Sequence, residues 1–296
     1  MRPAEQGFLL LSSSLGDPDR RPLSLSQLRI LGNRMENMPR PSQNRDLTAE
    51  DLLSIGYGGA QAQRILSLLE DVLQLERYLS RGKKHGCVPL TRVSSGFPKR
   101  LHERLGQESP GCLWAKGDLS LLNFPRIALV GSRDIHPENR EFAREAGAQA
   151  ARQGYVLVSG NARGADRIAQ DACLQNGGRV ISVIADELST KIVDERILYL
   201  SEDDFDQPFS AQRALSRNRI IHALCEKTLV AQSDLYTGGT WDGTVKNLRL
   251  GLSSVFCFHD GSVAANALVQ LGAEPVILSQ LKDLSVLQPC IESFLK

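Results

Sequence analysis

The chain has 296 residues, of which 42% are hydrophobic and 23% charged, and a formal net charge of +1. This composition indicates a soluble globular protein with one large domain or two ordinary ones. A charge so close to zero excludes a chain that is basic throughout, so any nucleic-acid binding must come from a local patch. No apolar run approaches the roughly 18–20 residues that a membrane-spanning helix needs.

The six cysteines are scattered along the chain, and no two form a C-x-x-C pair. Several lie among aliphatic residues, which is typical of buried, reduced thiols rather than of a zinc site or a disulfide framework. We therefore expect no metal, no cofactor and a reducing, cytoplasmic location. The apolar run at residues 7–11 is short and has no clear cleavage site, so we do not interpret it as a signal peptide.

Residues 1–80 are predicted to form a small helical domain. Apolar residues recur at helical spacing over 23–31, and Thr48 begins a second helix with acidic residues in its first turn. Glycines at 56–59 turn the chain, and one long helix with a broad apolar face is expected to include 65–78. Such a region could be a sterile-alpha-motif-like or helix-hairpin-helix-like unit that contacts DNA. The alternative is a small packing or interaction module, and the lack of a basic residue in the turn favours it.

Residues 81–296 are predicted to form an α/β domain. A short basic linker at 81–86 is followed by an extended, turn-rich segment at 87–125, and regular strand–helix alternation begins at 126. Several strands are apolar on both faces, which indicates a mostly parallel sheet covered on both sides, as in a doubly wound, Rossmann-like fold. We expect strands near 126–130, 155–158, 179–184, 228–232, 254–258 and 275–278, and helices at 137–153, 165–176, 211–225, 241–251 and 262–271.

Two of these strands end in small, glycine-containing loops that each carry an arginine. The first loop is Gly131-Ser132-Arg133. It is not a G-x-G-x-x-G fingerprint, and a Walker lysine is missing, so dinucleotide binding is disfavoured. The carboxyl ends of neighbouring parallel strands meet at one crevice, and glycine backbone with arginine suits a phosphate there.

The second loop holds the larger set of polar and small residues. Within 159–166 the candidates for phosphate binding are Ser159, Gly160, Arg163, Gly164 and Asp166. Arg163 brings charge, whereas Asp166 is expected to cap backbone N–H groups or to orient Arg163.

Two further segments extend the same edge. Arg217, Asn218 and Arg219 lie on one predicted helix, where they form either a solvated basic face or a set of phosphate contacts. Gly238, Gly239 and Thr240 begin the next helix and offer N–H groups and a hydroxyl to an anion. Tyr236 or Trp241 could stack on a base, although Trp241 could equally be buried.

In this order the motifs resemble the DNA-processing protein A (DprA/Smf) family. Gly-Ser-Arg at 131–133, Ser-Gly-Asn-Ala-Arg-Gly-Ala-Asp at 159–166 and Arg-Asn-Arg-Ile-Ile at 217–221 match its motifs, as does the Gly/Thr-rich turn at 237–244. The segment 96–123 also resembles the family's lead-in to the first core strand. Thr-Gly-Gly-Thr-Trp-Asp departs from the usual turn and shifts it towards related lysine-decarboxylase-like nucleotide hydrolases. The chain ends near 296 without room for the C-terminal winged helix of many members.

The resemblance implies a non-catalytic protein that binds single-stranded DNA, protects incoming DNA in natural transformation and loads a RecA-type recombinase, usually as a homodimer. Arginines 133, 163, 217 and 219 would neutralise successive phosphates. The alternatives are a nucleotide-binding sensor or N-glycosidic nucleotide hydrolase, including one in phage defence, and an interaction protein that recruits a partner through residues 1–80.

Overall fold

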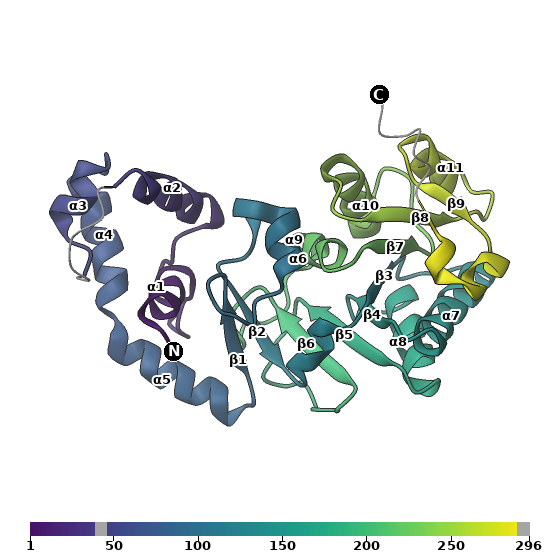
Figure 1. Cartoon of the computed structure of the whole chain (residues 1–296), viewed down its shortest axis with the longest axis horizontal. Coiled ribbons are helices and arrows are strands. Elements are labelled where there is room, and N and C mark those ends of the chain that lie inside the picture. Colours follow the sequence, from purple (N-terminus) through teal and green to yellow (C-terminus); the bar gives the residue numbers. More distant parts are fainter. Residues whose placement is uncertain (39–45, 289–296) are drawn as a thin grey trace.

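The structure is a computed structural model that describes residues 1–38 and 46–288. A helical N-terminal region lies at one end of the molecule and a nine-stranded α/β sheet occupies the rest (Figure 1). The helices of the N-terminal region are α1 (Pro3–Ser12), α2 (Leu25–Glu36), α3 (Ala49–Ser54), α4 (Gly59–Glu70) and α5 (Val72–Lys84).

The helix starts of this region follow local capping chemistry. The Ser24 hydroxyl accepts from the N–H of Gln27 at the start of α2, and the Thr48 hydroxyl accepts from the N–H of Asp51 at the start of α3. The apolar faces of α2, α3 and α4 then enclose a separate small core around Leu52. The helical character predicted for residues 1–80 therefore agrees with the structure.

The long helix expected over 65–78 is instead two helices that meet at Asp71. Asp71 has φ −76° and ψ 38°, which is outside the helical range and ends α4. The Arg20 guanidinium stabilises this break, because it pairs with the Asp71 carboxylate and donates to the carbonyl of Leu68 at 2.9 Å. The segment 81–86, which was expected to be a linker, is largely the last turn of α5.

The sheet is parallel except at one edge. Its order is β1-β2-β6-β5-β4-β3-β7-β8-β9, and only the β1–β2 and β2–β6 pairs among the described strands are antiparallel. The strands are β1 (Val88–Thr91), β2 (Cys112–Lys116), β3 (Arg126–Val130), β4 (Val156–Ser159), β5 (Arg179–Ile184), β6 (Ile197–Ser201), β7 (Lys227–Val230), β8 (Ser254–Phe258) and β9 (Glu274–Val276).

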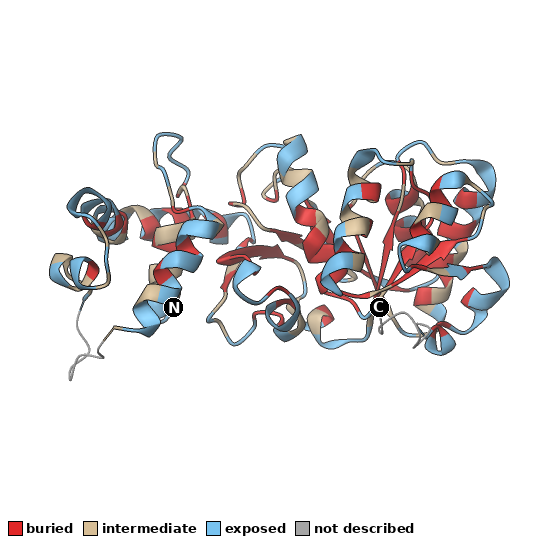
Figure 2. Ribbon diagram, turned by 90° about the horizontal axis from the view of Figure 1, so that it is seen from above, coloured by how far each residue is buried: buried red, intermediate tan, exposed pale blue. Residues whose placement is uncertain are grey.

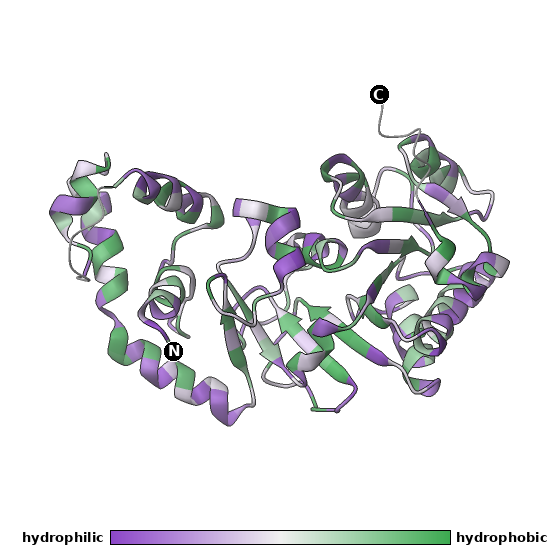
Figure 3. Cartoon of the chain, viewed as in Figure 1, coloured by the Kyte–Doolittle hydropathy of each residue, from purple (hydrophilic) through white to green (hydrophobic). Residues whose placement is uncertain are grey.

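Helices cover both faces of the sheet, so the Rossmann-like, doubly wound prediction is confirmed. Ile127 and Leu129 of β3 pack under the helices of one face, whereas Ala128 and Val130 pack under those of the other. This alternation explains why the strands are apolar on both sides (Figures 2 and 3). On the first face lie α7 (Pro137–Arg152) and α8 (Ala165–Gln175); on the second lie α6 (Lys99–Leu105), α9 (Ala211–Ala223), α10 (Gly238–Leu250) and α11 (Val263–Gln270).

The chain runs outward from β3 to β6 and then crosses back through α9 to β7, on the other side of β3. This reversal creates a crevice at the carboxyl ends of β3 and β7, where ligands bind in open α/β sheets. The six strands predicted from 126 onward and the helices between them are present within two or three residues of their expected bounds. Strand β6 was missed, because no helix separates it from β5 and a charged segment precedes it.

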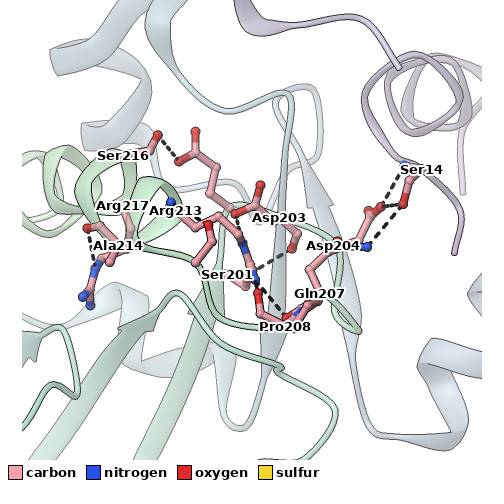
Figure 4. A network of polar contacts seen from close by, with 12 residues as sticks. Ser14, Ser201, Asp203, Asp204, Gln207, Pro208, Arg213, Ala214, Ser216 and Arg217 are labelled. Atoms are coloured by element: carbon pink, nitrogen blue, oxygen red, sulfur yellow. Dashed lines mark hydrogen bonds and ion pairs between the residues drawn. The ribbon is translucent and has the colours of Figure 1, made fainter. Parts of the chain in front are cut away.

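The helical region and the sheet share a core. Leu9 of α1 and Tyr78 of α5 pack with Trp114 of β2 and Phe205 in one buried cluster. The Tyr78 ring stacks on Phe205 at 4.6 Å and meets Trp114 edge-on at 5.5 Å. Asp204 also links the helical region to the sheet. Its carboxylate accepts from the backbone N–H of Ser14 at 2.8 Å and from the Ser14 hydroxyl at 2.7 Å (Figure 4).

Candidate functional site

The two glycine-containing loops are in direct contact at the crevice. The N–H of Ala165 donates to the carbonyl of Ser132 at 3.2 Å. Gly164 has φ 87°, and a Cβ built on it would lie 2.3 Å from the carbonyl oxygen of Arg133. Glycine is therefore required here by close packing as well as by backbone conformation. The contact between the loops holds Arg133 and Arg163 on the same rim of the crevice.

The two rim arginines are exposed. The Arg163 side chain is 76% exposed and forms a 2.7 Å ion pair with Asp134, whose side chain is 92% exposed. Such a pair in water contributes about 0–1 kcal/mol, so a phosphate can displace the Asp134 carboxylate. Within residues 1–38 and 46–288, the guanidinium of Arg133 has no ion-pair or hydrogen-bond partner. Arg133 can thus bind an anion directly, and Arg163 can do so by exchanging its exposed ion pair.

Behind the rim, Asp166 and Arg217 form a buried clamp on the second loop. The Asp166 carboxylate accepts from the N–H groups of Gly160 (3.1 Å) and Ala162 (3.3 Å). The Arg217 guanidinium donates to the carbonyl of Gly160 at 2.5 Å and to that of Val183. Burial raises the pKa of Asp166 and lowers the pKa of Arg217, and in each case the opposite charge of the other residue opposes the shift.

This clamp changes the expected role of the loop. The Gly160 N–H is occupied by Asp166, so it is not the bare donor to a ligand that the sequence suggested. A Cβ on Gly160 would lie 2.2 Å from an Arg217 nitrogen, which gives this glycine a packing role. Ser159 is fully buried beneath the loop. Asp166 holds loop N–H groups, as expected of a cap, but it lies beside Arg217 and not beside Arg163.

Arg219 lies away from the crevice and does not line its cavities. Its guanidinium is buried, pairs with the Glu202 carboxylate and donates to the carbonyl of Ser216 at 2.8 Å. Hydrogen bonding and attraction from Glu202 outweigh desolvation and raise the pKa of Arg219. Direct phosphate contact by this residue does not fit its position.

Arg213, on the same helix α9, is likewise bonded to neighbouring residues of the protein. It pairs with Asp203 at 2.6 Å and donates to the carbonyl of Gln207 at 2.9 Å (Figure 4). The arginines of α9 therefore mostly form hydrogen bonds and ion pairs within the protein, and they do not make a solvated basic face.

The start of α10 closes the crevice opposite the two loops. The Asn218 side-chain amide donates to the carbonyl of Gly239 at 2.9 Å, which fixes α9 against this turn. The N-cap residue Thr237 makes no side-chain capping bond, so it leaves the first N–H groups of α10 for other partners. Trp241 is buried, whereas Tyr236 is 77% exposed and meets the Trp241 ring edge-on at 5.1 Å.

Three adjoining cavities share Arg133 in their walls. A cavity of about 670 Å³ is lined by four arginines, Arg133, Arg140, Arg163 and Arg167. A cavity of about 550 Å³ brings Gly131, Ser132 and Arg133 together with Asp166, Arg217 and Asn218 and with Gly238, Gly239 and Thr240. A third, of about 310 Å³, lies between them and contains Gly160, Arg163 and Arg217. Together they form one groove along the carboxyl edge of the sheet.

Sequence reasoning missed two arginines of this groove and one residue that supports its first loop. Gln232 accepts from the N–H of His136 at 2.8 Å and donates to the carbonyl of Asp134 at 3.1 Å, so it fixes the first loop. Arg140 and Arg167 add charge, and their place in the first turns of α7 and α8 could have revealed them. The described residues contain no cluster of His, Cys, Asp or Glu that could hold a metal ion. Across 1–38 and 46–288, every helix is too short or too polar to cross a bilayer.

The fold and the groove define a Rossmann-like protein with a basic crevice at its switch point. Residues 89–284 match the model of the family described as DNA recombination-mediator protein A. The chain belongs to this family, as its motifs predicted.

Individual proteins agree with this assignment. The DNA processing protein DprA of Streptococcus pneumoniae is 36% identical over 142 residues, which is 44% of this chain and 50% of that protein. The chain spans about half the length of the first curated relatives it matches. The solved structure of S. pneumoniae DNA processing protein A superposes with a TM-score of 0.72 at 26% identity and covers 95% of this chain and 96% of that one. A Helicobacter pylori DNA processing protein A, described for its single-stranded DNA binding mode, shares the fold with a TM-score of 0.54 at 24% identity, over 64% of this chain and 90% of that one.

Proposed function

We propose that the chain is a non-catalytic DNA-processing protein that binds single-stranded DNA along the groove. The observation that carries this proposal is the group of exposed arginines on one rim, in a chain whose net charge is only +1. A row of guanidinium groups suits a polyanion better than a single phosphate. Membership of a DNA recombination-mediator family, and the single-stranded DNA binding mode of the H. pylori protein, support DNA as that polyanion.

The phosphate track in this proposal comprises Arg133, Arg140, Arg163 and Arg167. In the described part of the chain, these four line the largest cavity of the groove together with one acidic residue, Asp134. Guanidinium groups donate paired hydrogen bonds to phosphate oxygens and remain charged at all physiological pH values.

The remaining predicted residues would serve the track indirectly. Arg217 and Asp166 hold the second loop, and Asn218 holds the turn of Gly238, Gly239 and Thr240. Gly131 and Gly164 allow the two loops to meet, since a Cβ on Gly131 would lie 2.5 Å from that of Ala165. Arg219 supports α9 through Glu202 and has no direct role in this proposal.

The cellular role follows the family resemblance. It comprises protection of incoming DNA, delivery of that DNA to a RecA-type recombinase, assembly as a homodimer and a location in the cytoplasm. Five cysteines are free and buried in the described residues, which suits a reducing compartment.

A second candidate function is binding of a mononucleotide in the 550 Å³ cavity. The uncapped start of α10, with Gly238 and Gly239, favours it, because such a terminus attracts a phosphate. Asp242, the acidic residue within that turn, is exposed and does not line the cavity, so it lends no support to hydrolysis there.

A filter-binding series with oligo-dT at several salt concentrations tests the proposal. Arg163→Ala should weaken binding for all sequences alike and should reduce the log–log salt slope by about 0.7, the value for one phosphate on a single strand. Arg144→Ala is the matched control, because Arg144 is an exposed, ion-paired arginine on α7 outside the groove. Equal affinity and equal slope in the two variants would refute the phosphate track, and a thermal shift with a mononucleotide alone would favour the second candidate.

A further inference from the structure

A separate pocket of about 260 Å³ lies between α2 and α4, in the helical region at one end of the molecule (Figure 1). We call it the α2–α4 pocket. Its apolar part is formed by Leu23, Ile30, Tyr57 and Ile65. Leu23 and Ile65 belong to the small core of this region, and Ile30, which is 44% exposed, extends the apolar surface outward. The pocket is smaller than the clefts of roughly 300–1,000 Å³ that enclose drug-sized ligands, so it suits a side chain better than a cofactor.

Two arginines line the α2–α4 pocket, and both are held in place without a carboxylate. The Arg34 guanidinium lies 4.4 Å from the centre of the Tyr57 ring and donates to the carbonyl of Gly56 at 2.8 Å. The Arg64 guanidinium donates to two carbonyls of the segment that precedes α2, at 3.0 and 3.3 Å. Within residues 1–38 and 46–288, neither arginine forms an ion pair. Both positive charges are therefore available to an anionic ligand.

Two glutamines add hydrogen-bond donors to the same pocket. Each is the third residue of its helix and caps the helix start: Oε1 of Gln27 accepts from the N–H of Ser24 at 2.9 Å, and Oε1 of Gln61 accepts from the N–H of Gly58 at 3.5 Å. A backbone N–H can only donate, so the oxygen of each amide faces the helix start and the NH₂ group is left over. In the part of the chain that the structure describes, neither NH₂ group has an acceptor.

The chemistry of the pocket indicates what kind of ligand it would bind. Its arginines and glutamines offer donors, and none of the described residues that line it is acidic. A complementary ligand therefore presents negative charge, several acceptors and an apolar group. The phosphates of a nucleic acid supply the first two, but single-strand binders stack the bases on aromatic side chains, and the apolar surface here is mainly aliphatic. A peptide with carboxylates beside an apolar side chain supplies all three.

We propose that the α2–α4 pocket binds an acidic segment of a partner protein. An apolar side chain of the segment sits against Ile30, and carboxylates beside it pair with Arg34 and Arg64. The NH₂ groups of Gln27 and Gln61 donate to carbonyl oxygens of the same segment. This site goes beyond the proposed single-stranded DNA function, because its lining residues are separate from those of the groove and give the helical region a partner of its own.

The test selects peptides with the full chain. A phage-displayed library of short random peptides is selected against the immobilised protein, and the most enriched peptide is labelled with fluorescein for anisotropy measurements. Its affinity is measured for the wild type and for Arg34→Gln, Arg64→Gln and Ile30→Asp. Arg77→Gln is the matched control, because Arg77 is an exposed arginine of α5 outside the pocket and has no ion-pair partner among the described residues.

We expect the enriched peptides to carry acidic residues beside an aliphatic or aromatic one. Arg34→Gln and Arg64→Gln should each weaken binding of the labelled peptide about 3- to 10-fold, as for the loss of one hydrogen bond. Ile30→Asp should weaken it at least as much, because it places a carboxylate beneath the apolar side chain of the peptide. Arg77→Gln should bind the peptide as the wild type does, and the salt slope of oligo-dT binding should be unchanged in all four variants.

Three results would overturn the proposal. The first is enrichment of peptides without acidic residues. The second is equal peptide affinity in the wild type, Arg34→Gln and Arg64→Gln, or an equal loss of affinity in the control Arg77→Gln. The third is displacement of the labelled peptide by oligo-dT, which would assign the pocket to nucleic acid. The two arginine variants decide the matter if Ile30→Asp does not fold.

Discussion

Gly164→Ala should damage both the stability of the protein and the rim of the groove. The backbone of Gly164, with φ 87° and ψ −130°, lies in a region that is essentially restricted to glycine, so an alanine there is strained by about 1–3 kcal/mol. The added Cβ would also lie 2.3 Å from the carbonyl oxygen of Arg133 and 2.5 Å from that of Ser132. Moving backbone out of such an overlap costs about 1–3 kcal/mol more.

Gly177→Ala is the control for the backbone effect. Gly177 lies just beyond the other end of α8, has φ 75°, and an added Cβ would meet no atom within 4 Å. We expect it to cost about 1–2 kcal/mol, from the left-handed conformation alone. Urea denaturation of both variants gives the two free energies of unfolding and shows from the m value whether each transition remains two-state.

The difference between the two variants isolates the contact between the loops. Gly164→Ala should lose about 1–3 kcal/mol more than Gly177→Ala, and its affinity for oligo-dT, measured where it is folded, should fall because Arg133 is displaced. Equal destabilisation of the two variants would show that the loops do not pack as they do in the structure. Unchanged affinity for oligo-dT in a destabilised Gly164→Ala would show that the contact between the loops is not needed for DNA binding.

Three other predictions concern buried charged or titratable groups. Arg217→Met should cost about 3–5 kcal/mol in urea denaturation, because it removes the buried guanidinium that attracts the buried Asp166 carboxylate and donates to the carbonyls of Gly160 and Val183; a loss below 1 kcal/mol would contradict the clamp. His222, whose pKa burial lowers to about 4 in the folded state, below the unfolded value of 6.5, should contribute stability above pH 6.5 that declines by up to about 3 kcal/mol as the pH falls towards 4. The slope of unfolding free energy against pH should therefore be smaller in His222→Gln than in the wild type over this range. Identical slopes in the two proteins would refute the lowered pKa of His222 in the folded state. Arg219→Met should lower stability but leave the salt slope of oligo-dT binding unchanged, whereas Arg167→Ala should do the reverse; a reduced slope in Arg219→Met would return that residue to the phosphate track.

The sequence predicted the core of the fold because its signals are local. A strand such as β3, apolar on both faces and followed by glycine, is typical of the middle of a parallel sheet, and the structure covers it with helices on both sides. Strand β6 lacks this signal, because it is joined to β5 without a helix and only some of its residues are buried. The break at Asp71 was equally hidden, because it depends on Arg20, fifty-one positions earlier in the chain.

The candidate site could be located from the sequence, but the roles of its residues could not be assigned. Spacing placed Arg217 and Arg219 on one helix and could not show that each faces a carboxylate from another part of the chain, the buried Asp166 or the half-buried Glu202. The buried ring of His222 contacts Thr228 and Asn247, which lie 6 and 25 positions further on. Partners of this kind are set by tertiary packing, and a single sequence carries no local trace of them.

The two tryptophans lie in different parts of the molecule, so the fluorescence of each can be used as a probe of its own part. Trp114 lies in the aromatic cluster that joins the helical region to the sheet, and Trp241 lies under the turn at the start of α10, in contact with Tyr236. Trp114→Phe would thus leave a single indole whose fluorescence senses a ligand in the groove. Trp241→Phe would leave one that senses separation of the helical region from the sheet. If the shared core makes these parts one cooperative unit, the two emissions will change at the same denaturant concentration, and a ligand will quench one of them and leave the other unchanged.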